Sequence, residues 1–263
     1  MINDTNNSYI LTPYFLDEFE DDMLSLARSG WHIVERDLSP GKKQERMVEI
    51  YAELRDLVAQ SLIAGKKPVS VAGDCCTTIG FLAGLQKAGI NPTLIWFDAH
   101  GDFNTWETSP SGFLGGMPLA MLVGRGEQLL VDGVGMKTMP EDKVILSDGR
   151  DLDPGEREAL SGSAVEHLSE VSDLLNMPLP EGSIWVHFDV DVLNTEELPA
   201  VSYPASSGPS ADLIRRVFRR LAESGQVVAV SLSSWNPDLD PDGRSRDLSM
   251  ELLSVLLNDV PHW

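Results

Sequence analysis

Two acidic runs, each directly after an apolar stretch, constrain this chain more than any other feature of its sequence. The first is Asp-Ala-His-Gly-Asp at 98–102, after the apolar stretch 92–97, and the second is His-Phe-Asp-Val-Asp at 187–191, after 184–186. Apolar stretches of this length are typical of buried strands. Alternate positions of an extended segment face the same way, so each run predicts a strand end whose ligands point to one side.

The two runs belong to a longer alternation of apolar β-type segments and helical patterns. Strands that alternate with helices predict an α/β fold with a mostly parallel sheet covered on both faces, and sites in such sheets form at the carboxyl ends of the strands. With 263 residues and 42% hydrophobic content, the chain can form one domain spanning 1–263. We expect strands at 68–72, 93–97, 144–146, 183–189 and 226–232, helices at 14–26, 43–64, 79–88 and 211–224, and a loop at 148–156.

Charge and composition exclude several classes of partner. The formal net charge of −21 opposes binding to nucleic acid. No apolar stretch approaches the roughly 20 residues of a membrane span, and the N-terminal residues lack the pattern of a signal peptide. The only cysteines, Cys75 and Cys76, are adjacent, which excludes a disulfide framework. We therefore expect a cytoplasmic protein that acts on a small molecule, with no nucleic-acid or membrane partner.

The acidic runs are best explained by bound metal ions. Like charges gathered in one pocket would raise each other's pKa strongly without cations, and helix capping or pairing with basic residues would not explain their shared period. A carboxylate-rich set with imidazole suits Mn²⁺, with Fe²⁺, Co²⁺, Ni²⁺ and Zn²⁺ as alternatives. Paired cations can turn water into a nucleophile near neutral pH, which predicts a metal-dependent hydrolase. The ligand triplets are Asp98, His100 and Asp102 in the first run and His187, Asp189 and Asp191 in the second.

Four segments of the chain resemble motifs of the ureohydrolase family, which includes arginase and agmatinase. They lie in the family's order, at 72–75, 98–105, 150–156 and 188–191. The resemblance implies a three-layer α/β/α fold with an eight-stranded, mostly parallel sheet and a site for two Mn²⁺ ions. It also implies hydroxide attack on a guanidinium or amidine carbon with cleavage of a C–N bond. Family members commonly form trimers or hexamers, so a homo-oligomer is implied as well.

The resemblance further implies roles for individual residues. By matched position, Asp98 and Asp189 would bridge the two ions. Asp102 would complete the shell of one ion, hydrogen-bond the bridging hydroxide and act as the catalytic residue. His100 and Asp191 would complete the shell of the other ion.

Cys75 departs from the family, which usually has His at the matching position. A thiolate ligand would bias the site toward Zn, Fe or Ni. Alternatively, Cys75 is a small buried residue, and one ion is then bound loosely or not at all. His187 lies where the family more often has Ser. It either compensates for the missing imidazole or is a buried histidine that supports a ligand by hydrogen bonding.

Two further departures concern the substrate. Arginases carry a proton-shuttling His where this chain has Gly115, so another group or water must supply the proton to the leaving amine. Ser234 stands where arginase and agmatinase have a Glu that clamps the guanidinium, and a hydroxyl cannot neutralise a buried cation. The reacting end of the substrate is therefore expected to be less cationic than arginine, or differently shaped.

The far end of the substrate pocket matches the family better. Asn104 and Ser111 match positions that bind the substrate α-carboxylate in arginase, and Asp153 and Glu156 match positions near its α-ammonium. Loop hydrogen bonding at the first pair and turn capping around Pro154-Gly155 at the second are structural alternatives.

We therefore expect a hydrolase of linear C–N bonds. Its substrate would be an amino-acid derivative with an amidine, guanidino, hydroxyguanidino or formimino head, attacked by a metal-bridging hydroxide. A protein of this fold that binds metal and ligand without turnover is the first alternative. A deacetylase-like amide hydrolase with one Zn²⁺ is the second.

Overall fold

A parallel sheet forms the centre of the computed structural model, which describes residues 6–259. Within that range the sheet has eight strands in the order β4-β1-β5-β10-β9-β6-β7-β8, and each of their pairings is parallel. This confirms the predicted fold class. The strands are β1 (Asn7–Thr12), β4 (His32–Ile33), β5 (Lys67–Ala72), β6 (Thr93–Asp98), β7 (Val144–Asp148), β8 (Glu166–Leu168), β9 (Ile184–Asp189) and β10 (Val227–Ser233).

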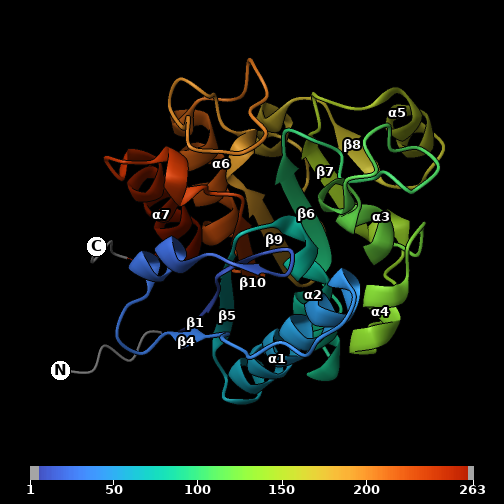
Figure 1. Ribbon diagram of the computed structural model, residues 1–263. Coiled ribbons are helices and arrows are strands. Elements are labelled where there is room, and N and C mark those ends of the chain that lie inside the picture. Colours follow the sequence, from blue (N-terminus) through green and yellow to red (C-terminus); the bar gives the residue numbers. More distant parts are fainter. Residues whose placement is uncertain (1–5, 260–263) are drawn as a thin grey trace.

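Helices cover both faces of the sheet and complete the three layers (Figure 1). One layer contains α1 (Lys43–Ile63), α2 (Thr78–Lys87), α3 (Pro118–Leu122) and α4 (Leu129–Val134). The other contains α6 (Ala211–Glu223) and α7 (Arg244–Leu257), while α5 (Pro154–Ser161) lies near the β7–β8 end of the sheet. No helix within residues 6–259 combines the length and apolar character of a membrane span.

Alternation along the central strands decides which layer each side chain meets. In β6, Leu94 and Trp96 pack in the apolar cluster that contains α1 and α2, whereas Ile95 and Phe97 pack in the cluster that contains α6 and α7. Both faces are buried, which explains why these strands are apolar throughout. By the same alternation, the side chain of Asp98 falls on the α1–α2 side of the sheet.

The structure corrects the predicted helix at 14–26. That segment forms a small hairpin of β2 (Tyr14–Phe15) and β3 (Glu18–Phe19), followed by the 3₁₀ helix η1 (Asp21–Leu26). Leu16 has φ +56, a left-handed conformation that ends a helix. The backbone N–H of Leu16 donates to the buried Asp74 carboxylate at 2.6 Å, so a long-range contact holds the turn.

The predicted loop at 148–156 is shorter than expected. Asp148 is the last residue of β7 and pairs with Asp98 of β6. The helix α5 already begins at Pro154, because Asp153 and Glu156 form a reciprocal capping box with proline at the first helical position.

Candidate metal centre and cavity

The acidic runs lie at strand ends as predicted. Their side chains do not, however, meet by alternating along one extended strand. β6 ends at Asp98 and β9 ends at Asp189, so His100, Asp102 and Asp191 lie beyond the strands. This corrects the picture of two extended triplets. Tight turns after each strand bring the later ligands back over the sheet.

Hydrogen bonds of the ligands themselves shape these turns. The Asp98 carboxylate accepts from the backbone N–H of His100 at 2.7 Å, and Asp189 accepts from that of Asp191 at 2.9 Å. Asp191 in turn accepts from the backbone of Ala99 at 3.1 Å, which links the two strand ends. Asp102 has φ +49, a left-handed conformation that aspartate tolerates better than most residues.

Gly101 allows this turn to approach the next loop closely. A Cβ at this position would lie 2.6 Å from Leu152 Cδ2 and 2.7 Å from the Glu156 carboxyl carbon. Any side chain there would push the turn away from α5, so glycine is required for the close approach.

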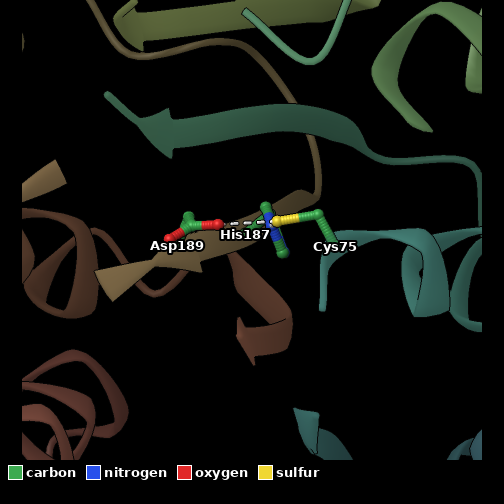
Figure 2. A group of neighbouring side chains, drawn as sticks. All are labelled: Cys75, His187 and Asp189. Carbon is green, nitrogen blue, oxygen red and sulfur yellow. Dashed lines mark hydrogen bonds between the residues drawn. The ribbon is translucent and has the colours of Figure 1, made fainter. Parts of the chain in front are cut away.

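A third strand end contributes Cys75. It follows β5 and begins the 3₁₀ helix η2 (Cys75–Thr77), whose N-terminus is capped by Asp74. The Cys75 thiol donates to Asp189 Oδ2 at 2.7 Å, and Cys75 Sγ lies 3.3 Å from Nε2 of His187 (Figure 2). The imidazole of His187 therefore faces the Cys75 thiol. This position is compatible with both predicted roles of His187, as a ligand and as a buried histidine that supports a ligand.

The predicted metal ligands fall into overlapping groups whose donor atoms lie within 4.8 Å of one another. Asp98 belongs to two of these groups and Cys75 also belongs to two. All members are buried except His100, which is partly exposed. Among the described residues, the groups are Asp98, His100 and Asp191; Cys75, Asp98 and Asp102; and Cys75, His187 and Asp189.

The carboxylates are too close to carry their charges without compensation. Burial, reinforced by the neighbouring carboxylates, raises the pKa of Asp102 and of Asp189 well above the usual range. Burial would also raise the pKa of Asp98, but hydrogen bonds from His100 and Trp96 outweigh it and lower this pKa. At His100, burial is outweighed by Asp191 and Asp98, which raise its pKa to about 12.

This donor set fits divalent cations. A buried group of carboxylates is costly without positive charge, and no lysine or arginine of residues 6–259 lines the adjoining cavity. The nearby Arg150 is committed elsewhere, since it pairs with Asp148 and donates to the backbone carbonyls of Val192 and Ala205. The single positive charge of a protonated His100 cannot neutralise several carboxylates. Divalent cations therefore suit this group of ligands better.

The cavity beside this centre has a volume of about 640 Å³. Every predicted metal and substrate residue lines it except Asp98 and His187, which are both buried. Nine carboxylates of the described chain line the cavity, and they are Glu20, Asp74, Asp102, Asp151, Asp153, Glu156, Asp189, Asp191 and Asp238.

The predicted substrate residues form a connected network at one side of the cavity. The Asn104 amide donates to Asp153 at 3.0 Å and accepts from Thr108 at 3.0 Å. The Glu156 carboxylate accepts from the backbone N–H of Phe103 and of Asp153. Burial raises the pKa of Glu156 to about 7. These side chains thus make the loop and capping hydrogen bonds that were considered as structural alternatives. Their contact with substrate remains a prediction.

Ser234 and Ser111 have different surroundings. Ser234 has φ +74, and its hydroxyl donates to Asp189 Oδ2 at 2.5 Å, so it supports the centre directly. Ser111 is exposed, and its hydroxyl accepts from the backbone N–H of Phe113 at 3.2 Å.

Aromatic side chains at the cavity were missed from the sequence. The Phe113 ring stacks on Phe15 and packs against the half-exposed Tyr203, with ring centroids 6.2 and 5.1 Å apart. A Cβ at Gly115 would lie 2.3 Å from the Phe113 ring. These rings come from three distant segments, and no local pattern could have joined them. We call Phe15, Phe113 and Tyr203 the aromatic wall.

Asp74 and Arg150 were also given no role from the sequence. Asp74 ties the turn at Leu16 to the start of η2, since its carboxylate also accepts from the backbone of Cys76 at 2.7 Å. Burial raises the pKa of Asp74 to about 6. An Asp directly before a helical pattern is a capping signal that could have identified the local half of this role.

Side chains able to bind metal ions gather at the carboxyl edge of a parallel sheet, beside an acidic cavity. This arrangement is that of an α/β metallohydrolase. Comparison with known proteins supports this class. The chain matches the Arginase family over residues 28–258. It is 36% identical to arginase of Bacillus subtilis (strain 168) over 205 residues, which are 73% of this chain and 69% of that protein. It is 32% identical to arginase of Bacillus caldovelox over 228 residues, or 81% and 76% of the two chains.

The fold agrees with these matches. A crystal structure of arginase from Bacillus subtilis superposes with a TM-score of 0.84 at 25% identity and covers 98% of this chain and 99% of that chain. The chain therefore belongs to the arginase family, and the predicted ureohydrolase resemblance is confirmed. It is a hydrolase that acts on linear amidine C–N bonds. Membership implies a dinuclear metal site and a small-molecule substrate.

Proposed function

We propose that this protein uses two divalent cations, with Mn²⁺ as the leading candidate, to hydrolyse an amidine-type head of a small amino-acid derivative. One observation carries the proposal, namely that predicted ligands from three strand ends gather in overlapping groups, two of which contain Asp98 and two of which contain Cys75. In this assignment Asp98 and Asp189 would contact both ions, Cys75 and Asp102 would hold one ion, and His100 and Asp191 would hold the other.

The cations supply a water-derived nucleophile near neutral pH and polarise the substrate. Asp102 would then carry the proton, because its carboxylate lines the cavity and, with the cations offsetting the neighbouring negative charge, would be ionised and able to accept one. It accepts a proton from the attacking water and returns it to the nitrogen that leaves. This route supplies the proton that Gly115 cannot.

Neighbouring residues keep the centre in place during these steps. Ser234 donates to the carboxylate of Asp189 and fixes its rotation. Arg150 holds the backbone that follows Asp191, through the carbonyls of Val192 and Ala205. Fixed ligands need no reorganisation when charge develops on the substrate, which favours the reaction.

The substrate is proposed to carry an amidine, guanidino, hydroxyguanidino or formimino head. Its head lies near Ser234, where a hydroxyl can hydrogen-bond a neutral or weakly basic group. Its amino-acid end lies near Asn104, Ser111, Asp153 and Glu156. The aromatic wall packs along the chain that connects the two ends.

The test is reconstitution of the purified chain with Mn²⁺, followed by assay of urea, hydroxyurea, formamide and ammonia release from a panel of these four head groups. We expect turnover of at least one compound, loss of turnover with a chelator, and recovery when Mn²⁺ is restored. Two bound ions without turnover of any head group would instead favour the non-catalytic alternative. One bound Zn²⁺ with amidase activity would favour the deacetylase-like alternative.

We also propose a homo-oligomer, which sedimentation analysis of the purified chain would test. The cytoplasmic location stays a prediction. The single domain over 1–263 also stays a prediction, and residues 1–5 and 260–263 lie outside the described part of the chain.

A further inference from the structure

The two ends of the candidate metal centre differ in the softness of their donor atoms. The group of Asp98, His100 and Asp191 offers two carboxylates and one imidazole. The group of Cys75, His187 and Asp189 offers a sulfur, an imidazole and one carboxylate. Thiolate ligands favour zinc and other thiophilic ions, whereas oxygen-rich sets favour manganese or magnesium. Such a difference would make the two positions chemically unequal.

The sulfur-containing group is already assembled. Cys75, His187 and Asp189 are each more than nine-tenths buried. Figure 2 shows the Cys75 sulfur and the Asp189 carboxylate pointing toward one another, with the His187 imidazole beside them. Cys75 Sγ lies 2.7 Å from Asp189 Oδ2 and 3.3 Å from His187 Nε2. One ion could therefore replace the thiol proton and contact the three donors with small movements.

The surroundings of His187 orient Nε2 for this purpose. Its Nδ1 lies 2.9 Å from the Ser231 hydroxyl oxygen, which also accepts from the indole N–H of Trp185. That oxygen has two lone pairs and can accept from both groups. When Nδ1 carries the ring proton, the lone pair of Nε2 faces Cys75. Metal-ligating histidines are commonly held by a hydrogen bond of this type.

Trp96 restrains the same ring from the side. Its ring centroid lies 3.9 Å from that of His187, and its indole N–H donates to Asp98 at 2.9 Å. These contacts hold the imidazole where its Nε2 faces the Cys75 sulfur.

We propose that Cys75, His187 and Asp189 form a metal position that selects Zn²⁺ over Mn²⁺, while Asp98, His100 and Asp191 form the harder position of the same centre. This inference rests on the two-ion site of the proposed function. It makes His187 a metal ligand in place of a supporting residue, and it makes the loaded protein a mixed Zn–Mn species.

Cobalt provides a direct probe, because a thiolate bound to Co²⁺ gives a near-ultraviolet charge-transfer band that oxygen and nitrogen ligands do not. The full chain, stripped with a chelator and titrated with Co²⁺, is expected to show this band. Cys75→Ser should abolish the band, whereas Cys76→Ser should retain it. Cys76 is the matched control, since it is equally buried but its sulfur faces the carbonyl of Leu114.

His187→Gln tests the imidazole separately. We expect the band to persist with altered visible d–d transitions, and the affinity for this cobalt to fall by more than the roughly 10–100-fold that loss of a supporting hydrogen bond costs. Unchanged visible transitions and unchanged affinity in a folded His187→Gln protein would show that His187 is not a ligand. Far-ultraviolet circular dichroism establishes the folding of each variant.

A competition experiment on the unmodified chain does not depend on any variant. After dialysis against Zn²⁺ and a large excess of Mn²⁺, which offsets the generally tighter binding of zinc, we expect about one of each ion per chain. Two Mn²⁺ ions without Zn²⁺, or cobalt binding without a charge-transfer band, would overturn the proposal. Turnover with Mn²⁺ alone is scored separately. The metal analysis therefore tests the zinc-selective position, and the turnover assay tests the hydrolase function. Either proposal can be contradicted without the other.

Discussion

The metal side and the substrate side of the cavity are built in different ways. The metal side consists of the ends of β5, β6 and β9, where neighbouring strands fix the positions of buried carboxylates. The substrate side consists of loops that carry Asn104, Phe113 and Tyr203, and its aromatic residues are more exposed than the carboxylates of the metal side. Parallel strands bring distant ligands together by hydrogen-bond register, whereas loops can change without disturbing the sheet.

This contrast explains where the chain departs from the family pattern. The carboxylates of the metal side are retained, while Gly115 and Ser234 on the substrate side differ. Cys75 is the exception, because it lies on the metal side, where it follows β5 and faces a histidine of β9, two strands away in the sheet. The reaction class is that of the arginase family, and the departures at Gly115 and Ser234 support the proposal that the reacting head of the substrate differs from that of arginine.

Asp98→Ala should have the largest effect on the metal side. Its carboxylate belongs to two ligand groups, so its loss disrupts both ion positions. We expect activity to fall by roughly 10³-fold or more, since metal-dependent stabilisation of the transition state is usually the dominant contribution. Steady-state assays and metal analysis would measure it. Asp132→Ala in α4, an exposed acidic position, is the control. Full activity in Asp98→Ala would exclude this centre.

Asp102→Asn should separate catalysis from folding on the same side. Asparagine tolerates the φ of +49 at this position and keeps the shape of the side chain, but it cannot hold the transferred proton. We expect kcat to fall by about 10²–10⁴-fold with little change in melting temperature. Asp102→Ala should lose both activity and stability. A fully active Asp102→Asn protein would remove the proposed proton carrier.

Phe113→Ala should have a smaller effect, because it lies on the substrate side. Aromatic contacts of this type contribute about 0.5–1.5 kcal/mol each, which corresponds to a rise in KM of roughly 2- to 12-fold. The value of kcat should change little, since the ring does not touch the metal side. Trp106→Ala is the matched control, as its exposed aromatic ring does not line the cavity. A large fall in kcat alone would contradict the assigned role of the wall.

Glu156→Gln should have a small effect on stability that is visible in its pH dependence. Burial raises the pKa of Glu156 from 4.5 to about 7, so the folded state binds this proton more tightly than the unfolded state. The contribution of Glu156 to the free energy of unfolding therefore falls as pH rises from about 4.5 to about 7. Glutamine removes this contribution. Denaturant titrations should show a shallower decline for Glu156→Gln over that interval, and an identical decline would contradict the assignment.

Much of the fold could be predicted because the central strands and helices carry strong local signals. The predicted helices at 43–64, 79–88 and 211–224 correspond to α1, α2 and α6 within one residue at each end. The segment 14–26 was wrong because its turn depends on Asp74, which is distant in the sequence. Short edge strands such as β4 and β8 were not predicted, since two or three residues are too few for a periodic pattern.

Most of the candidate metal ligands could be predicted from the sequence by itself, because they form two acidic runs of similar spacing, each directly after an apolar strand. Only the tertiary structure decided how those ligands meet, since strand register, the turns after Asp98 and Asp189, and the approach of Cys75 to His187 depend on contacts between distant segments. The aromatic wall was decided in the same way, because its three rings come from β2 and two distant loops that only the folded chain brings together.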